Sequence, residues 1–274
     1  MKKILVVILN YRTYKMTLNL IKELNYLDTS LFDILVIDNC SKNESADILN
    51  KYAKKYNYSF IKNSSNSGYA SGNNIGIRQG IDLGYEYTLI LNNDLKIIDK
   101  DFINNIYKKA EDNKNIACIG PKIYDINQNV VAPYVNRPTF YTLTLGLIKE
   151  KKIRSKYENE ICEVYRVFGC CMLLRNSAMN QIDCFDERTF LYCEEEILAE
   201  KLLKHNLITM YFPEASILHM ESSTVGKKRG ISSLAKIKVI NKSLSLYLDE
   251  YRKFNYWQRR IIIAIRDLLI FLKG

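Results

Sequence analysis

The chain contains the stretch Tyr87-Thr88-Leu89-Ile90-Leu91-Asn92-Asn93-Asp94, an apolar run that ends in a carboxylate. Apolar runs of this length that are rich in β-forming residues are typical of strands covered on both faces. In open α/β sheets, ligands bind beyond the carboxyl ends of such strands. Asp94 is therefore a candidate ligand for a metal or a phosphate, although Asn and Asp are also ordinary turn residues.

Strand and helix patterns alternate before this stretch. Unbroken apolar runs predict strands, and apolar residues three or four positions apart predict helices. The predicted strands are 4–9, 32–37 and 58–62, and the predicted helices are 17–27, 45–56 and one that follows the 63–76 loop and ends near Leu83. Strands separated by helices of this size predict a doubly wound α/β fold with a mostly parallel sheet.

Polar segments follow three of the predicted strands. They are Asn10-Tyr11-Arg12, Asp38-Asn39-Cys40-Ser41 and Asn92-Asn93-Asp94. Because the carboxyl ends of parallel strands lie at the same edge of a sheet, we expect these segments to converge on one crevice. A fourth segment, 66–76, is rich in glycine and asparagine, so its backbone can approach a bulky ligand closely. It matches neither a Walker loop nor a GxGxxG fingerprint.

Length and composition fit a globular protein with one large domain or two small ones. The chain has 274 residues, of which 47% are hydrophobic and 26% are charged, and these values exclude disorder. Its seven cysteines form no CxxC pair, and no signal-peptide pattern precedes the first strand. A reducing cytoplasm is therefore expected.

The net charge of +10 is concentrated at the C-terminus. From Val225 onward there are twelve Lys and Arg and three acidic residues, a net charge of +9, which leaves +1 for the rest of the chain. Polynucleotide binding favours basic residues spread among aromatics across the body, so no nucleic-acid partner is expected. A cationic tail on a near-neutral body indicates a partner of its own, and an anionic membrane surface is the natural candidate.

The tail itself reads as two helices. Residues 227–230 predict a hinge, and residues 231–248 and 251–272 predict the helices. Charged side chains interrupt the apolar pattern of the last one, so it is too polar to span a bilayer and is expected to lie on its surface. The alternative is packing on the main body or on a second subunit, which leaves a homodimer open.

Taken together, the polar segments resemble the nucleotide-sugar half of glycosyltransferase family 2, the inverting enzymes of the GT-A fold. The residues that carry this resemblance are 7–11, 36–41, 66–76 and 91–94. Further on, 185–187 and 190–195 resemble the acceptor-side motif of the rhamnosyltransferase-like branch, and His219 with Ser222 and Ser223 resembles its closing motif.

The resemblance implies a division of the chain. The GT-A domain is expected at 1–224, with a nucleotide-sugar half at 1–123 and an acceptor half at 124–224, and basic amphipathic helices follow at 225–274. Within the acceptor half, the irregular stretch 124–164, with its basic cluster at 149–154, is expected to form an acceptor loop or lid. Residues 168–175 are expected to form a strand entered through Gly169.

By this resemblance, a set of polar and small residues binds the nucleotide sugar, namely Asn10, Tyr11, Asp38, Ser41, Gly68, Asn73, Asn92, Asn93 and Gly169. Asp94 is the expected metal ligand, and His219 adds a ligand or contacts the diphosphate. The family motif reads Asp-x-Asp where this chain has Asn92-Asn93-Asp94, so one negative charge is missing. The expected cofactor is Mg²⁺ or Mn²⁺, held by few carboxylates and by diphosphate oxygens.

Inverting transfer needs a base that deprotonates the acceptor hydroxyl. Glu195 takes the place of the family's aspartate and is the expected base, with Glu194 as the supporting carboxylate. Repulsion among Glu194, Glu195 and Glu196 is expected to raise the pKa of one of them, and the sequence leaves open which. A solvated acidic patch at a helix start is the alternative, against which the apolar residues at 190–192 argue.

The resemblance implies an enzyme that transfers a sugar from dTDP-rhamnose or a UDP-hexose to a lipid-linked saccharide. The product would be a bacterial surface polysaccharide such as capsule, O-antigen or cell-wall rhamnan, made at the inner face of the plasma membrane by a peripheral cytoplasmic protein. One alternative is a non-catalytic protein that binds nucleotides or nucleic acid in the same crevice. Another is a nucleotidyltransferase, which would need more basic phosphate contacts than Lys2, Lys3 or Arg12 provide.

Overall fold

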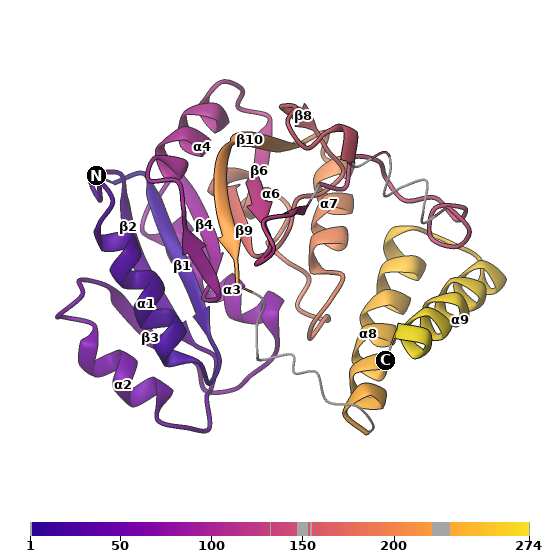
Figure 1. Ribbon diagram of the computed structural model, residues 1–274, viewed down its shortest axis with the longest axis horizontal. Helices are drawn as coiled ribbons and strands as arrows, with labels where there is room; N and C mark the ends of the chain where they lie inside the picture. Colours follow the sequence, from indigo (N-terminus) through magenta and orange to yellow (C-terminus); the bar gives the residue numbers. More distant parts are fainter. Residues whose placement is uncertain (1, 132, 147–152, 154, 221–230, 274) are drawn as a thin grey trace.

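The computed structural model describes residues 2–131, 133–146, 153, 155–220 and 231–273. Within these residues one sheet runs through the body in the order β3-β2-β1-β4-β9-β6-β10-β5, with β7 paired to β6 and β8 to β10 (Figure 1). The strands are β1 (Ile4–Asn10), β2 (Phe32–Asp38), β3 (Ser59–Lys62), β4 (Tyr87–Asn92), β5 (Leu95–Ile97), β6 (Ile116–Tyr124), β7 (Val130–Val131), β8 (Cys162–Glu163), β9 (Cys171–Arg175) and β10 (Ile208–His219). The helices are α1 (Tyr14–Asn25), α2 (Ser45–Tyr52), α3 (Tyr69–Asp82), α4 (Phe102–Glu111), α6 (Asn176–Gln181), α7 (Glu194–Lys204), α8 (Ile231–Leu246), the π-helical turn η2 (Tyr247–Tyr251) and α9 (Tyr256–Lys273).

The amino-terminal half of the sheet is parallel, as the sequence predicts. Strand β1 lies between β2 and β4 and runs parallel to both. Asn10 faces Asp38 in register, and Leu9 faces Asn92. The polar segments that follow these three strands therefore emerge at one edge of the sheet, where a ligand site is expected.

Helices cover both faces of this sheet because its central strands are apolar on both sides. Alternate residues of β1 point to opposite faces, and Ile4, Val6 and Ile8 pack with α1 and α4. On the other face, Leu5 and Val7 pack with α3, α6 and α7. The acceptor half joins the same sheet through β9, which pairs antiparallel with β4 and with β6.

Several predicted boundaries are wrong. The helix predicted at 17–27 begins at Tyr14, and the one predicted at 45–56 ends at Tyr52. The strand predicted at 168–175 begins only at Cys171, because the Gly169 N–H turns away from the sheet and donates to the Glu195 side chain. The helix predicted to begin at 251 begins at Tyr256. Here α8 continues into η2, and Lys253, with φ of 55°, breaks the helical path before α9 starts.

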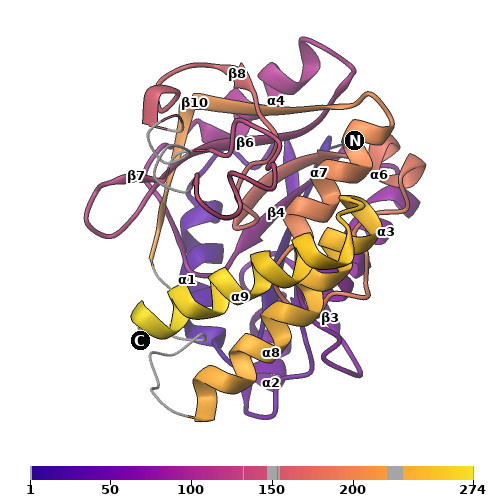
Figure 2. The ribbon, with the colours of Figure 1, turned by 90° about the vertical axis from the view of Figure 1, so that its right-hand side faces the viewer.

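The C-terminal helices pack on the body rather than standing apart from it. A third apolar cluster joins Cys193 and Ile197 at the start of α7 to Tyr247, Leu248 and Ile262. Figure 2 shows α9 crossing α8 on the outside of the molecule. Among the described helices, none has the length and apolar character needed to cross a membrane.

Candidate active site

Asp38 anchors the loop that follows β2. Its side chain is completely buried, and it accepts hydrogen bonds from Asn10 Nδ2 at 2.7 Å and from the Ser41 backbone N–H at 2.9 Å. The Ser41 hydroxyl in turn accepts the backbone N–H of Arg12 at 2.8 Å. Tyr11 is partly exposed beside this network, with the Arg12 guanidinium 5.0 Å from its ring centre. Four of the predicted nucleotide-sugar residues are therefore neighbours in space.

A second network ties the β4 loop to the β1 loop. Asn93 Nδ2 donates to the hydroxyls of Thr13 and Thr17 at 2.8 and 2.9 Å. The Thr17 hydroxyl donates a hydrogen bond to Asn10 Oδ1 at 2.8 Å. Asn92 is partly exposed at the end of β4, and its backbone N–H donates to the Cys170 carbonyl at 2.9 Å. These bonds hold the two loops at fixed positions on the same edge.

Asp94 has one carboxylate oxygen without a partner among the described residues. Its side chain is 5% exposed, Oδ2 lies 3.3 Å from His219 Nε2, and the buried Oδ1 accepts no hydrogen bond. A buried, unsatisfied carboxylate oxygen is costly unless something positive meets it. No group of three or more His, Cys, Asp or Glu side chains that would hold a metal occurs in the described part of the chain. The pair therefore fits a cation whose other ligands come from the substrate.

The glycine-rich loop touches the acceptor-side segment directly. Gly68 has φ of 103°, and a Cβ built on it would lie 2.1 Å from the Phe190 carbonyl oxygen. The next residue, Tyr69, donates its backbone N–H to that same oxygen at 2.9 Å. Asn73 is buried in the first turns of α3, where its Nδ2 donates to the Tyr69 carbonyl at 3.1 Å. Only glycine fits at position 68, so this contact explains its place in the sequence.

Gly169 lies against the predicted base. Its backbone N–H donates to Glu195 Oε1 at 3.0 Å, and its carbonyl accepts the Tyr69 hydroxyl at 2.6 Å. A Cβ at this position would lie 2.6 Å from Glu195 Oε1, so any side chain would displace the carboxylate. The backbone of this residue thus fixes Glu195 and connects it to the glycine-rich loop.

The three consecutive glutamates differ in environment. Burial, followed by repulsion from Glu195, raises the pKa of Glu194 to about 8, and its Oε1 has no partner among the described residues. Burial also raises the pKa of Glu195, against the opposing pull of the Arg166 guanidinium. Glu196 forms an ion pair with Arg166 at 3.0 Å. Glu196 is therefore engaged elsewhere, and Glu194 and Glu195 are the two candidates for proton transfer.

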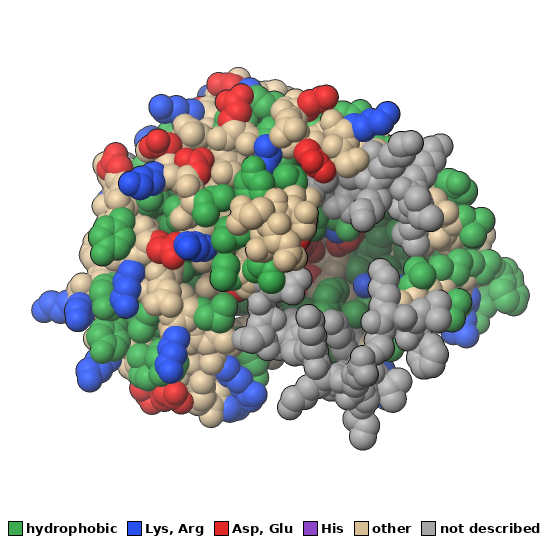
Figure 3. Space-filling view, in the orientation of Figure 1, with side chains coloured by type: hydrophobic (Ala, Val, Ile, Leu, Met, Phe, Trp, Pro, Cys, Tyr) green, Lys and Arg blue, Asp and Glu red, His purple; other side chains and the backbone are tan. Residues whose placement is uncertain are grey.

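Asp94 and Glu195 both affect the pKa of the Cys170 thiol. Burial is the main cause that raises the pKa of Cys170, and the negative charges of Asp94 and Glu195 raise it further. The backbone of 169–170 bonds to Asn92 on one side and to Glu195 on the other. Figure 3 shows a hollow between the body and the C-terminal helices with acidic side chains on its floor. The segment 169–170 is therefore bonded both to Glu195 and to Asn92, which lies two residues before Asp94.

Three contributors to this site are absent from the sequence-based set. Tyr69 is partly buried, and burial, followed by the charges of Glu195 and Glu194, raises its pKa well above the usual range. Thr17 joins the two asparagine networks. Arg166 pairs with Glu196 and stacks 3.7 Å from the Tyr134 ring centre. A signal for Arg166 was available, since it is a lone cation within the apolar run 164–168.

Some predicted features lie outside the described residues. These are Ser222 and Ser223 of the closing motif, the hinge at 227–230, and most of the basic cluster at 149–154.

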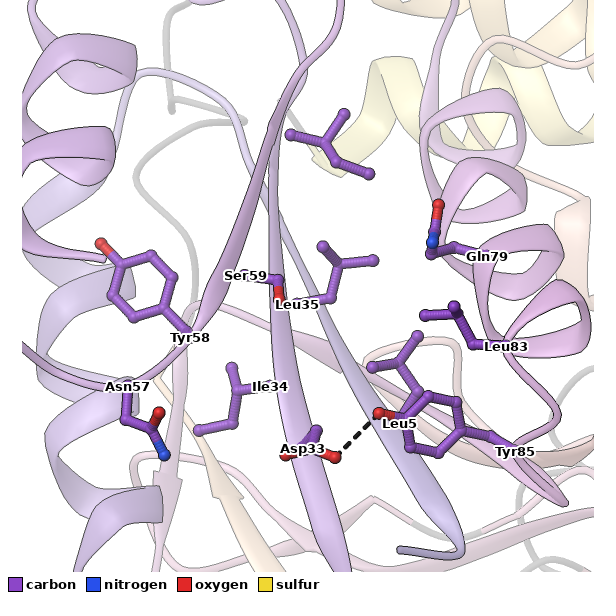
Figure 4. Close-up of a pocket in the computed structure, with 11 residues that line it drawn as sticks. Leu5, Asp33, Ile34, Leu35, Asn57, Tyr58, Ser59, Gln79, Leu83 and Tyr85 are labelled. Atoms are coloured by element: carbon purple, nitrogen blue, oxygen red, sulfur yellow. Dashed lines mark hydrogen bonds between the residues drawn. The ribbon is translucent and has the colours of Figure 1, made fainter. Parts of the chain in front are cut away.

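A cavity of about 330 Å³ lies at the opposite edge of the sheet, between β2, β3 and α3 (Figure 4). Its one carboxylate, Asp33, is already paired with Lys2 at 2.9 Å and with the Tyr85 hydroxyl at 2.8 Å. The remaining lining is mainly aliphatic and amide side chains, including Leu35 and Gln79. This cavity offers no free titratable group, so the polar edge remains the candidate active site.

Comparison with solved structures identifies the fold. The chain superimposes on the mannosyltransferase PcManGT from Pyrobaculum calidifontis, solved in complex with GDP-Man and Mn²⁺, with a TM-score of 0.64. The match covers 96% of this chain and 68% of that chain at 11% identity, which shows likeness of fold alone. The predicted GT-A fold is confirmed.

The sequence comparison identifies the family. The sequence model of glycosyl transferase family 2 matches residues 5–182, which is more than half of the chain. The chain belongs to this family, as the resemblance of its strand-end motifs implies.

Two curated relatives are similar to parts of the chain. The "Low-salt glycan biosynthesis hexosyltransferase Agl10" of Haloferax volcanii is 28% identical over 203 residues, covering 74% of this chain and 62% of the relative. The "N-acetylglucosaminyl-diphospho-decaprenol L-rhamnosyltransferase" of Mycobacterium tuberculosis is 30% identical over 101 residues, covering 37% of this chain and 31% of the relative. The chain thus spans less than two thirds of the length of each of these relatives.

Proposed function

We propose that this protein transfers a sugar, with inversion, from a nucleoside diphosphate donor to a hydroxyl group of a lipid-linked saccharide. The observation that carries the proposal is that the segment 169–170 bonds to Asn92, two residues before the proposed cation ligand Asp94, and to the proposed base Glu195. Inversion requires the base and the leaving group to lie on opposite sides of the anomeric carbon. One carboxylate that follows β4 and another in the first turn of α7 suit that requirement.

The donor would lie along the polar edge. Asn10, Asp38 and Ser41 form the rigid wall of a nucleoside pocket, with Tyr11 as a partly exposed surface for the base. Because both Asp38 oxygens already accept hydrogen bonds, we infer that this buried carboxylate mainly shapes the pocket. Asn92, Asn93 and the backbone of Gly68 and Gly169 would face the ribose, diphosphate and sugar. Asn73 would complete this set from α3, since its Oδ1 is buried without a partner among the described residues.

A divalent cation, Mg²⁺ or Mn²⁺, fits the Asp94–His219 pair. The free Asp94 Oδ1 and the neighbouring His219 Nε2 would supply two ligands, and diphosphate oxygens would supply others. PcManGT, which shares the fold, was solved with Mn²⁺. When bound, such an ion stabilises the negative charge of the leaving diphosphate.

Glu195 would act as the base. It accepts the proton of the acceptor hydroxyl while the acceptor oxygen bonds to the anomeric carbon, and the bond from that carbon to the diphosphate breaks and releases the nucleoside diphosphate. Burial raises the pKa of Glu195, which increases its affinity for that proton. Glu194, with a pKa of about 8, would stand beside it as a largely protonated supporting group at neutral pH.

The donor and acceptor follow from the relatives as proposals. The similarity to the rhamnosyltransferase favours dTDP-rhamnose as the donor. The similarity to the hexosyltransferase leaves a UDP-hexose as the alternative donor. The rhamnosyl relative is named for an N-acetylglucosaminyl-diphospho-decaprenol, a lipid-linked sugar. We therefore propose a lipid-linked saccharide of a surface polysaccharide as the acceptor of this protein. We also propose that 1–224 form the catalytic domain and 225–274 an appended helical unit.

We further propose that α9 docks the protein peripherally on the anionic inner face of the plasma membrane. Trp257, Ile261 and Leu268 recur at helical spacing and are 73%, 45% and 56% exposed, so an apolar stripe faces outward. Exposed cations such as Lys253 and Arg260 flank it. Hydrophobic side chains gather over these helices in Figure 3. All seven cysteines are free, which suits a reducing compartment.

The docking proposal has a direct test. Trp257→Ser with Leu268→Ser should abolish sedimentation with phosphatidylglycerol-containing vesicles, whereas Tyr26→Ser, which removes an aromatic side chain that is 89% exposed on the body, should not. Retained binding by the double variant would refute docking through α9.

The catalytic proposal is tested by nucleoside diphosphate release from a panel of nucleotide sugars with Mn²⁺ and a lipid-linked acceptor. Glu195→Gln should abolish transfer and leave donor binding within about twofold, because base catalysis contributes to the chemical step and not to binding. Glu214→Gln, at an exposed position on β10, is the matched control. Normal turnover by Glu195→Gln contradicts the proposed base, and no release with any donor favours the non-catalytic alternative.

A further inference from the structure

The turn that directly precedes the proposed base is conformationally strained. Tyr192 and Cys193, which directly precede α7, have φ of 74° and 66°. Consecutive left-handed residues that are not glycine are unfavourable and persist only where the surroundings hold them. Since Glu194 and Glu195 follow at once, whatever holds this turn also sets the direction of both carboxylates.

Contacts with the C-terminal helices α8 and η2 stabilise this turn. Ser243 on α8 is 3% exposed, and its hydroxyl donates to the Leu191 carbonyl at 2.9 Å, one residue before the turn. The Cys193 side chain packs in the same apolar cluster as Leu244 and Tyr247. The turn thus rests on α8 and η2 rather than on the sheet.

A buried polar cluster fixes the same helices to α7 one turn further on. Glu200 accepts hydrogen bonds from Arg137 Nε at 3.0 Å and from the Tyr165 hydroxyl at 2.9 Å, and Arg252 Nη1 lies 3.3 Å from it. The Tyr165 and Tyr247 hydroxyls are 2.9 Å apart. Because Glu200 is nearly fully buried, removing one of these partners would leave a buried carboxylate less well paired. This cluster therefore fixes the position in which α7 packs against η2.

A second set of contacts joins η2 to residues 186–188. The Tyr251 hydroxyl donates to Asp186 Oδ2 at 2.6 Å, and Arg188 bridges Asp186 and Glu250 at 2.6 and 2.7 Å. Asp186 and Arg188 belong to the acceptor-side segment that leads to the strained turn. Both ends of that segment are thus tied to the π-helical turn.

We propose that α8 and η2 form a brace for the catalytic carboxylates, in which Ser243 and Tyr247 are positioning residues. The inference rests on the proposed function, since it assigns the brace to Glu194 and Glu195 of that site. The inference also goes beyond the proposed function, because α7, α8 and η2 lie after residue 182, where the match to the family ends. In this protein the helical unit at 231–251 completes the active site from outside the part of the chain that matches the family.

The test uses full-length variants that remove one hydroxyl each. Ser243→Ala with Tyr247→Phe should lower kcat about tenfold and leave the dissociation constant of the donor within about twofold, because a small misplacement of a reacting group affects the chemical step most. The matched controls are Ser245→Ala, also on α8, and Tyr256→Phe on α9, both exposed. They should keep the wild-type kcat.

A double-mutant cycle separates positioning from general stability. Glycine adopts positive φ without strain, so in a Tyr192→Gly background the turn needs less support. The fall in kcat caused by Ser243→Ala should therefore be smaller in that background than in the wild type. A purely structural role would instead lower the melting temperature and give the same fractional fall in both.

The outcomes are distinct from those of the catalytic proposal. If Glu195→Gln is inactive but the Ser243 and Tyr247 variants match their controls in kcat, the brace is refuted and the base assignment survives. If Glu195→Gln is active, the proposed base fails first.

Discussion

Gly169→Ala is the most direct perturbation of the proposed base. A Cβ at this position would lie 2.6 Å from Glu195 Oε1, whereas ordinary contacts begin at 3.4 Å, so the carboxylate must move by the difference, about 0.8 Å. The move also strains the 3.0 Å hydrogen bond from the Gly169 N–H. Misplacement of a catalytic group by about 1 Å can cost up to roughly 100-fold, so we expect kcat to fall about 10- to 100-fold. Because the displaced atom is the end of a flexible side chain, the fold should lose at most about 1–2 kcal/mol.

The assay is steady-state release of nucleoside diphosphate, with donor affinity and thermal unfolding measured in parallel. Gly80→Ala is the matched control, since its Cβ would lie 2.7 Å from Thr88 Oγ1, also a side-chain end, but near the opposite edge of the sheet. The control should keep its kcat. A Gly169→Ala enzyme with wild-type kcat, or an equal loss in both variants, would refute the reasoning that the backbone at 169 positions Glu195.

Three further predictions concern single side chains. Asp94→Asn should weaken Mn²⁺ binding in the presence of nucleoside diphosphate at least about tenfold by calorimetry, and unchanged affinity would exclude Asp94 as a ligand. Gly68→Ala should lower the free energy of unfolding by roughly 2–4 kcal/mol in denaturant titrations, because φ is 103° and the Cβ would meet the Phe190 carbonyl; an unmoved midpoint would contradict this contact. Burial raises the pKa of Glu194 from 4.5 to about 8, so the folded chain keeps a proton that the unfolded chain loses, and stability falls as pH rises through that range. Glu194→Gln should therefore unfold at the same temperature as the wild type at pH 4 and be more stable at pH 8 and above, by up to about 5 kcal/mol, and a gap that does not widen with pH would show that the carboxyl is not buried as a neutral acid.

The donor half could be predicted from the sequence because its signals are local. Apolar runs fixed the strands, and parallel pairing placed Asn10, Asp38 and Asn92 at one edge without any knowledge of side-chain contacts. The same reasoning anticipated a raised pKa among the three glutamates. It named mutual repulsion as the cause, whereas burial is the larger cause for Glu194, and burial depends on packing that a linear pattern does not contain.

The rest of the site depends on contacts between distant segments. Tyr69 meets Gly169 across 100 positions, and Asn74 meets Phe185 across 111. No spacing rule predicts such pairs, because they form only when segments far apart in the sequence pack against one another. The strained turn at 192–193 is equally invisible, since neither Tyr nor Cys is a residue that usually marks positive φ.

The positively charged side chains of the C-terminal segment have two separate roles, one in the fold and one in the proposed membrane docking. The sequence suggested one external partner for all of it, but Arg252 contacts the buried Glu200 and Arg259 pairs with Asp249, so part of that charge serves the fold. Lys253 and Arg260 are exposed beside the apolar stripe of α9 and remain available to an anionic surface. Deletion of the whole segment would remove the brace and the docking face together and could not tell them apart. Point changes on α9 should release the protein from vesicles and leave kcat on a soluble acceptor unchanged, whereas changes on α8 and η2 should do the reverse.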